Sequence, residues 1–439
     1  MSNTVWPLAG TFLMESDGVM LLKQIFFVLM MCLMGVSAAH AVEDGRLSLN
    51  AALAEAHMNN PELISARGKL KAAEAQRGIV TSGVLPQLSV TAAGDTGKSG
   101  DKKQAESYSY GVNGRQLLFD GFKTSNDLAA AREQIKSAQY NYQVVSSNVR
   151  LELRTAFIGL LSAQENLNVT RNILKRRRQN MDLVALQYQG GREHKGSLMT
   201  AEANVAQAEL DLISAERAME LYQRSLLKAL GRGTFAPVTA VGDLAVGEID
   251  RAKPEFEILV ETTPLLKDLA ARKEAARFGV KSARSDFFPQ VYADAGTSRS
   301  DAGWPPQTRS WSAGINLSFP IFQGGQQQAA LAKAKAVYQQ AEADTRSGRD
   351  GVIFTLAQSW IQWLNDVDQS VVQEKFFQAA QQRAQIVEAQ YKSGLASFND
   401  WTIIEDDLVR NQKSLLQAKT SALLAEASWF QAKGETLDE

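Results

Sequence analysis

The sequence has few of the residues that build most chemical sites. It holds one cysteine and three histidines among 439 residues, which is too few for a disulfide framework, a histidine metal cluster or a Ser-His-Asp triad. Lysine plus arginine (47) nearly balances aspartate plus glutamate (48), so no global basic field attracts nucleic acid. We therefore expect no catalytic residue, no cofactor, no metal site and no nucleic-acid partner. The 10 prolines are also few, which favours long uninterrupted elements.

One long hydrophobic run occurs near the N-terminus, from Ile25 to Val36. It is too short for a spanning helix, which needs about 20 apolar residues. Lys23 precedes the run and Ala39-His40-Ala41 follows it, which is typical of a secretory signal with its cleavage site. We predict a signal peptide over residues 1–41, with translation starting at Met20 because residues 1–19 fit no such signal. Cleavage would remove the only cysteine, so no lipid anchor is expected; an uncleaved membrane anchor is the alternative.

The chain contains an internal duplication. Leu85-Pro86-Gln87-Leu88 corresponds to Phe288-Pro289-Gln290-Val291, and Gln187-Tyr188 corresponds to Gln390-Tyr391, each 203 residues later. The displacement needs no gap anywhere, so the two copies should have nearly equivalent structures. We predict a first structural repeat at residues 42–231, a connector with Gly and Pro at 232–253, and a second structural repeat at 254–439.

Each copy predicts a helix, two strands, a long helix and a second long helix, in that order. Apolar residues alternate with small polar ones in the strands, most clearly from Ser310 to Phe319. The long helix, Phe122 to Tyr188 in copy one, carries apolar residues at sevens with one step of four between Val149 and Leu153. This is the pattern of a coiled coil with a stutter. A Gly-containing turn then reverses the chain, so each copy predicts an antiparallel helical hairpin.

The apolar face of these four strands needs a partner. A membrane-spanning strand has about 9 to 11 residues, and an open sheet edge in lipid leaves backbone groups unpaired. Four strands cannot close a barrel, so contact with outer-membrane lipid requires several copies, and a trimer gives twelve strands. A soluble four-stranded sheet packed on helices is the alternative. The predicted lipid-facing residues are Leu88, Val90, Tyr108, Tyr110, Val112, Val291, Trp311, Ile315, Leu317 and Phe319.

Several motifs stand at fixed places in this order of elements. They are the Leu-Pro-Gln start of a strand, Phe-Pro-Ile-Phe-Gln-Gly-Gly from Phe319 to Gly325, and a Tyr-x-x-Gly turn at Tyr391. Together they resemble the TolC-type outer membrane factors, over essentially the whole mature chain. The resemblance implies a mostly α fold of long antiparallel coiled-coil helices with four strands per chain. A homotrimer would complete these as a twelve-stranded membrane β-barrel and an α-helical tunnel.

The resemblance also implies a place and partners. The protein would lie in the outer membrane of a Gram-negative bacterium and extend into the periplasm. Its partners would be a periplasmic adaptor protein and an inner-membrane pump or ABC exporter. We predict a passive exit duct of a tripartite efflux pump or a type I secretion system, with drug, metal ion and polypeptide all open as cargo. A secreted coiled-coil structural or adhesive envelope protein is the alternative, and an envelope enzyme is a further one.

Two functional regions follow from the same resemblance. In the family, aspartates near the start of the last helix close the tunnel; Asp400 matches one of them and Ile403 does not match the next. Asp400 is therefore the predicted pore constriction, although an aspartate there can equally cap the helix. The helix-to-helix turns resemble tips that receive the adaptor, and their glycines suit turns that need positive φ. The predicted adaptor-contact residues are Tyr188, Gly190, Gly191, Ser197, Tyr391 and Gly394.

The two copies differ where strand passes into helix. Copy one has Gln116-Leu117 where copy two has Phe319-Pro320, and Gln323 replaces Asp120. The junctions therefore need not bend alike, because proline fixes φ.

Three other patterns have an ordinary explanation. Gly94 to Ser99 resembles a phosphate loop, but Ala92 stands where the first glycine is required. The basic run Lys175 to Arg178 could suggest nucleic acid, although a solvated or inter-helix face is favoured. Glu405 to Asp407 are interpreted as a solvated helix face.

Overall fold

The computed structural model describes residues 45–97, 105–247 and 249–438. The predicted signal peptide lies outside these described residues. No helix among them holds a stretch both long and apolar enough to cross a membrane.

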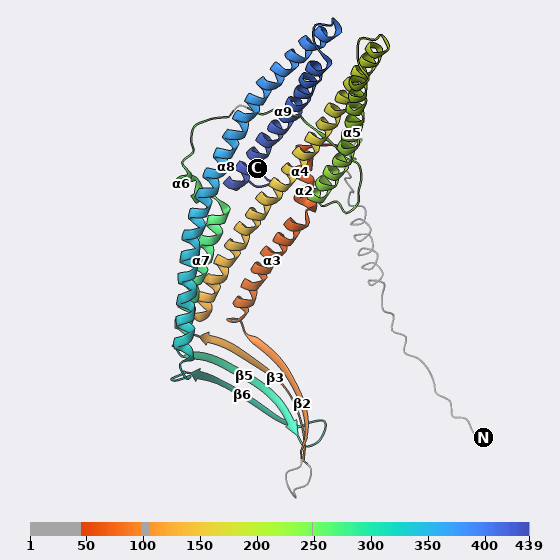
Figure 1. Cartoon of the computed structure of the whole chain (residues 1–439). Coiled ribbons are helices and arrows are strands. Elements are labelled where there is room, and N and C mark those ends of the chain that lie inside the picture. Colours follow the sequence, from red (N-terminus) through yellow and green to blue (C-terminus); the bar gives the residue numbers. More distant parts are fainter. Residues whose placement is uncertain (1–44, 98–104, 248, 439) are drawn as a thin grey trace, which may run out of the picture. The chain divides into compact units, whose positions relative to one another are not determined.

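The two halves of the chain fold as matching series of elements (Figure 1). In the first half a short strand and helix precede the series, and in the second half a short strand and two short helical turns do. The first half comprises β1 (Arg46–Ser48), α2 (Leu49–Asn59), α3 (Pro61–Ser82), β2 (Gln87–Gly97), β3 (Ala105–Phe119), α4 (Lys123–Gln189) and α5 (Lys195–Leu230). The second comprises β4 (Thr239–Val241), α6 (Phe256–Leu259), η2 (Val260–Thr262), α7 (Pro264–Ser285), β5 (Gln290–Asp301), β6 (Thr308–Ser318), α8 (Gln326–Lys392) and α9 (Phe398–Lys433).

Equivalent helices have equal lengths. Both α4 and α8 have 67 residues, and both α5 and α9 have 36. Local signals set their starts: Asn60 caps α3 by accepting hydrogen bonds from two backbone amides, and Pro61 occupies the first turn, where no donor is needed. Pro264 stands at the same point of α7.

The four long strands form one antiparallel sheet in the order β2-β3-β5-β6. Two hairpins are thus joined by the pairing of β3 with β5. A second sheet pairs β1 with β4 in parallel, Leu47 opposite Ala240. This sheet lies partly in the segment predicted as a connector, and no periodicity could predict it because each strand has only three residues.

The long helices pack as two hairpins, α4 with α5 and α8 with α9, and α4 also packs against α7 and α9. The heptad residues form the seams: Val149, Leu153 and Leu160 of α4 are fully buried, on both sides of the stutter. In the second copy Leu356 is fully buried and Trp429 nearly so. The predicted fold class, mostly helical with four long strands per chain, is confirmed; the short pair β1 and β4 is additional.

Candidate membrane wall and helical tips

One face of the sheet carries almost all of its large apolar residues. Cross-strand register places Val90 opposite Val112 and Ala92 opposite Tyr110, and pairs Val291 with Leu317 and Ala293 with Ile315. Directly opposed residues share a face, so nine of the ten predicted lipid-facing residues lie on this one face; the tenth, Phe319, lies one residue beyond β6. In the single chain Leu88, Val90, Trp311 and Ile315 are each more than 70% exposed.

The opposite face of the sheet is polar. Its alternating positions hold Ser, Thr, Asn and Gly, and a small charged group lies among them. Arg115 Nε lies 3.5 Å from Asp294 Oδ1, and the Arg115 guanidinium lies 3.9 Å from the centre of the Tyr292 ring. Asn316 Nδ2 donates to Asp294 Oδ2 at 2.7 Å. The sheet is therefore a wall with one apolar side and one hydrated side.

The outer strands of this wall are open. Within the described residues β2 pairs only with β3, and β6 pairs only with β5. Each outer strand is 11 residues long, enough to span a bilayer core when tilted. An apolar wall with two unpaired edges is an incomplete structure in lipid.

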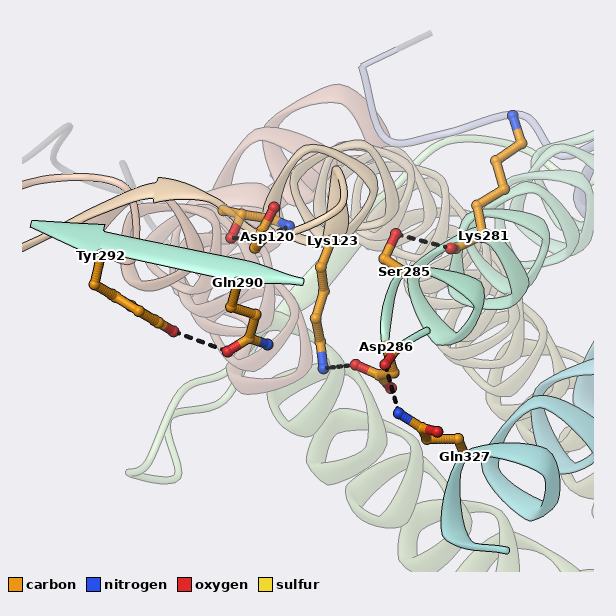
Figure 2. Close-up of polar contacts among 9 residues, drawn as sticks. Asp120, Lys123, Lys281, Ser285, Asp286, Gln290, Tyr292 and Gln327 are labelled. Carbon is orange, nitrogen blue, oxygen red and sulfur yellow. Dashed lines mark hydrogen bonds and ion pairs between the residues drawn. The ribbon is translucent and has the colours of Figure 1, made fainter. Parts of the chain in front are cut away.

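The junctions from wall to helices meet at one acidic residue, Asp286, which follows α7 (Figure 2). Lys123 Nζ of α4 lies 2.6 Å from Asp286 Oδ1, and Gln327 Nε2 of α8 donates to the Asp286 carbonyl oxygen at 2.7 Å. The Asp120 carboxylate accepts from the Thr124 amide in the first turn of α4 at 2.7 Å. Both copies of the junction are thus tied together at the base of the sheet.

The two junctions do differ as expected from their sequences. In copy one β3 continues to Phe119 through an irregularity between Leu117 and Phe119. In copy two β6 ends at Ser318, just before Phe319-Pro320. Both then use two successive residues with positive φ, Gly121-Phe122 in copy one and Gly324-Gly325 in copy two.

The turns at the far ends of the helices from the sheet (Figure 1) use glycine at one position each. Gly191 has φ +71° and Gly394 φ +80°, values that an L residue rarely adopts. Gly190 has φ −78°, so its predicted need for positive φ is wrong. Its equivalent in the second copy is Ser393, with φ −87°.

The predicted tip residues have different exposures. Tyr188 is 40% exposed, and the three glycines lie on the surface. Ser197 is 1% exposed and Tyr391 5%, so the side chains of these two residues are not available for contact. Tyr391 instead stacks on Trp401 with ring centres 4.4 Å apart, and its hydroxyl donates to Glu193 of the other tip at 3.2 Å. Burial, aided by Glu193, raises the pKa of Tyr391.

A feature that the sequence analysis missed is Leu395, directly after Gly394. It is 81% exposed at the α8–α9 turn, where the first copy has Arg192. The sequence could not show this, because an apolar residue directly after a turn glycine commonly packs back on the helix end.

Asp400 lies at the third position of α9 and belongs to a capping box with Ser397. Ser397 Oγ accepts from the Asp400 amide at 3.1 Å and donates to Asp400 Oδ2 at 2.6 Å. The capping role is therefore present, and the carboxylate is exposed in the single chain. Its equivalent in copy one is the buried Ser197, where His194 caps α5.

Glu405 is buried, so its interpretation as part of a solvated face is wrong. Its exposed fraction is 6%, and it lies beside Arg177, Asn204 and Trp401 around a small cavity between the two hairpins. Burial raises the pKa of Glu405, although Arg176 and Arg177 oppose the shift. The sequence Glu405-Asp406-Asp407 does not indicate which of the three acidic side chains faces a neighbouring helix.

Ion pairs join the two hairpins along their length. Arg177 of α4 pairs with Asp406 of α9, and Lys413 Nζ of α9 lies 2.8 Å from Asp211 Oδ2 of α5. Burial acts to raise the pKa of Asp211, but hydrogen bonds from Lys413 and Gln207 bring it below its usual range. Arg178 pairs with Glu209 of α5 at 2.7 Å. Arg177 and Arg178, two residues of the basic run Lys175 to Arg178, therefore lie at contacts between helices. No group of three or more potential metal ligands occurs among the described residues.

An amphipathic wall continued by two long helical hairpins is the architecture expected of a membrane-channel chain. A family model described as "Outer membrane efflux protein" matches residues 52–232 and 257–435. The chain therefore belongs to the outer membrane efflux protein family, whose members are channels, and it is an outer-membrane protein.

Individual relatives are distant but extend over most of the chain. It is 23% identical over 394 residues to the outer membrane efflux protein BepC of Brucella suis, covering 88% of this chain and 85% of BepC. It is 26% identical over 407 residues to SilC of Salmonella typhimurium, named a probable outer membrane lipoprotein, covering 87% and 84%. The crystal structure of VceC from Vibrio cholerae superposes with a TM-score of 0.77 at 20% identity, covering 89% of this chain and 96% of VceC.

Proposed function

We propose that three copies of this chain form a passive exit duct, with a twelve-stranded barrel in the outer membrane and a helical tunnel below it. The observation that carries the proposal is the sheet, which has one apolar face, one polar face and two open edges. Closed barrels in membranes start at about eight strands, so four strands per chain require partners. Three copies give twelve strands, with the polar faces lining the lumen.

The helices fit the second part of the duct. A helix of 67 residues is about 100 Å long at 1.5 Å per residue, and it continues directly from the wall. Substrates would diffuse along this tunnel, since energy would come from an inner-membrane pump or ABC exporter through a periplasmic adaptor. Both an efflux pump and a type I secretion system remain suitable partners for such a duct.

The test is the state of the purified mature protein. We expect a trimer that needs detergent to stay folded and that conducts ions across a planar bilayer. A water-soluble chain without conductance would contradict the duct and favour the secreted coiled-coil alternative. Fractionation of cells should place the protein with outer-membrane rather than periplasmic markers.

We propose the exposed part of the tips as the adaptor-docking surface. The turns supply exposed apolar area for such a contact, with Tyr188 40% and Leu395 81% exposed, and tyrosine is among the residues enriched at protein interfaces. Replacing Gly394 by Trp should abolish transport while trimers stay intact. Gly190→Ser is the matched control, since the second copy already has Ser393 there. Normal transport by the Gly394 variant would argue against docking at the tips.

Asp400 is proposed as the pore constriction. Threefold symmetry would place three Asp400 carboxylates around one axis, where they would attract cations. The exposure of Asp400 in the single chain and its fixed position in the first turn of α9 support this. We expect Asp400→Ala to weaken cation selectivity or cation block in bilayer recordings. Unchanged selectivity and conductance would mean that Asp400 only caps α9. In that case Asp400→Ala should still lower the melting temperature, because it removes the capping box with Ser397.

A further inference from the structure

Two arginines face each other on the apolar side of the wall. Arg299 of β5 is directly opposite Arg309 of β6. Arg299 is also opposite Tyr110 of β3, which belongs to the predicted lipid-facing set. Directly opposed residues share a face, so both guanidinium groups leave the wall on the side of Val112, Trp311 and Ile315. Both arginines are exposed.

Within the described residues, the carboxylates on this face are not paired with these arginines. Among the described residues neither Arg299 nor Arg309 has an ion pair or a side-chain hydrogen bond. Asp301 is on the same face and keeps its charge, but its carboxylate accepts from the Ala302 amide at 2.8 Å and forms no ion pair with either arginine. Glu106, further out, accepts from the Tyr108 hydroxyl at 3.4 Å. Like charges directly opposed across strands are destabilising, so the pair calls for an external anion.

A neighbouring subunit would not supply that anion from its wall. If β2 of a second copy pairs with the free edge of β6, its residues on the apolar face are Leu88, Val90, Ala92, Gly94 and Thr96. None of them carries a carboxylate. The basic pair would therefore stay unneutralised by β2 in the closed barrel.

The level of the arginines along the wall points to the membrane interface. Eight residues separate Leu317 from Arg309, about 27 Å along a strand at 3.4 Å per residue. With a tilt of about 40° this is about 21 Å of height, close to the top of an apolar band about 25 Å tall. The turn between β5 and β6 lies beyond it, away from the helices (Figure 1), so this end of the proposed duct faces outward.

Aromatic residues mark the same level. Trp304, between β5 and β6, is 71% exposed and lies against Tyr108 and Tyr110, with ring centres 6.2 Å and 6.4 Å apart. Exposed Trp and Tyr collect at the lipid headgroups of membrane proteins. Arginine is the side chain best shaped to bind phosphate, through paired N–H donors.

We propose that Arg299 and Arg309 form a binding site for the phosphate groups of an anionic glycolipid in the outer leaflet. The proposal rests on the proposed function, which sets the orientation of the wall. The lipid would neutralise the arginine pair, while its acyl chains would lie on the apolar face below.

The experiment uses the full-length protein, purified in detergent and stripped of lipid. Bis-phosphorylated lipid A is added, and native mass spectrometry counts the lipid bound per subunit. We expect R299Q/R309Q to bind about thirtyfold more weakly, since each basic residue near an anionic lipid contributes a factor of about five. Arg115→Gln is the matched control, because Arg115 lies on the polar face and pairs with Asp294; its binding should equal that of the wild type.

Two further arms identify the ligand. In the first arm, lipid A without phosphates should bind the wild type as weakly as intact lipid A binds the double variant. In the second, millimolar inorganic phosphate should not displace lipid A from the wild type. Equal binding by the double variant, equal binding of the dephosphorylated lipid or displacement by phosphate would each overturn the site. The same spectra give the oligomeric state. A double variant that forms trimers but does not bind lipid A therefore tests the lipid site separately from the proposed duct. A water-soluble monomer would overturn both proposals.

Discussion

The turn between α8 and α9 depends on glycine for its backbone conformation alone. Gly394 has φ +80°, and a Cβ added there would meet no atom within 4 Å. Gly394→Ala therefore introduces conformational strain without a clash. For an L residue this strain is roughly 1–2 kcal/mol, which makes local opening of the turn about 5 to 30 times more frequent.

Hydrogen exchange measures that opening directly. The turn protects the amides of Leu395 and Gly394, which donate to Gln390 O at 2.8 Å and to Tyr391 O at 3.0 Å. Peptides covering these amides should exchange about 5 to 30 times faster in Gly394→Ala, while core peptides of α8 stay unchanged. Gly190→Ala, at φ −78°, is the control and should not accelerate exchange at its own turn. Equal exchange in the wild type and Gly394→Ala would refute the argument from φ.

Two further changes test the interior and the junction. Burial raises the pKa of Glu405. The contribution of Glu405 to stability is therefore complete at low pH and is lost as the pH rises through the raised pKa. Glu405→Gln should thus increase the melting temperature at pH 7 more than at pH 4. An equal gain at both pH values would contradict this. Phe122 is a non-glycine residue at φ +66°, and its equivalent is Gly325. Phe122→Gly should be more stable than Phe122→Ala by about 1 kcal/mol, because both lose the ring contact with Phe119 and only Ala keeps the strain; an equal or lower melting temperature for Phe122→Gly would contradict the strain.

Periodicity predicted the seams and the wall because it reports which side of an element is buried. The heptad step of four between Val149 and Leu153 kept both residues fully buried, as a stutter should. Alternation likewise placed Val90 and Val112 on one face, where the register pairs them. These features depend only on spacing within one element.

Features that depend on contacts between distant segments were not predictable in this way. The pairing of β1 with β4 joins Leu47 to Ala240, and three residues are too few to show a period. The burial of Glu405 depends on the other hairpin, which supplies Arg177 and Asn204. The error at Gly190 was avoidable, however, since the duplication offers Ser393 as its equivalent.

The duplication also predicts how subunits would join. In the chain, β3 of the first copy pairs with β5 of the second. In a closed ring, β6 of one subunit would pair with β2 of the next. This contact is equivalent to the β3–β5 contact, because in both the second strand of one copy pairs with the first strand of the other. Asn113 is opposite Gly296 in the chain, so the equivalent pair between subunits is Asn316 with Ala93.

This register is testable because the sequence has only Cys32, within the predicted signal peptide. Opposed residues of antiparallel strands have Cα atoms about 4.5 to 5.5 Å apart, within the range of a disulfide. We expect Ala93→Cys with Asn316→Cys to give disulfide-linked dimers and trimers on oxidation, seen as a ladder without reductant. Ser89→Cys with Asn316→Cys is the control, because Ser89 lies four residues away on the same face, about 14 Å along the strand. Crosslinks in the control but not in the test pair would show that subunits join in another register, and the equivalence of the two contacts would be wrong.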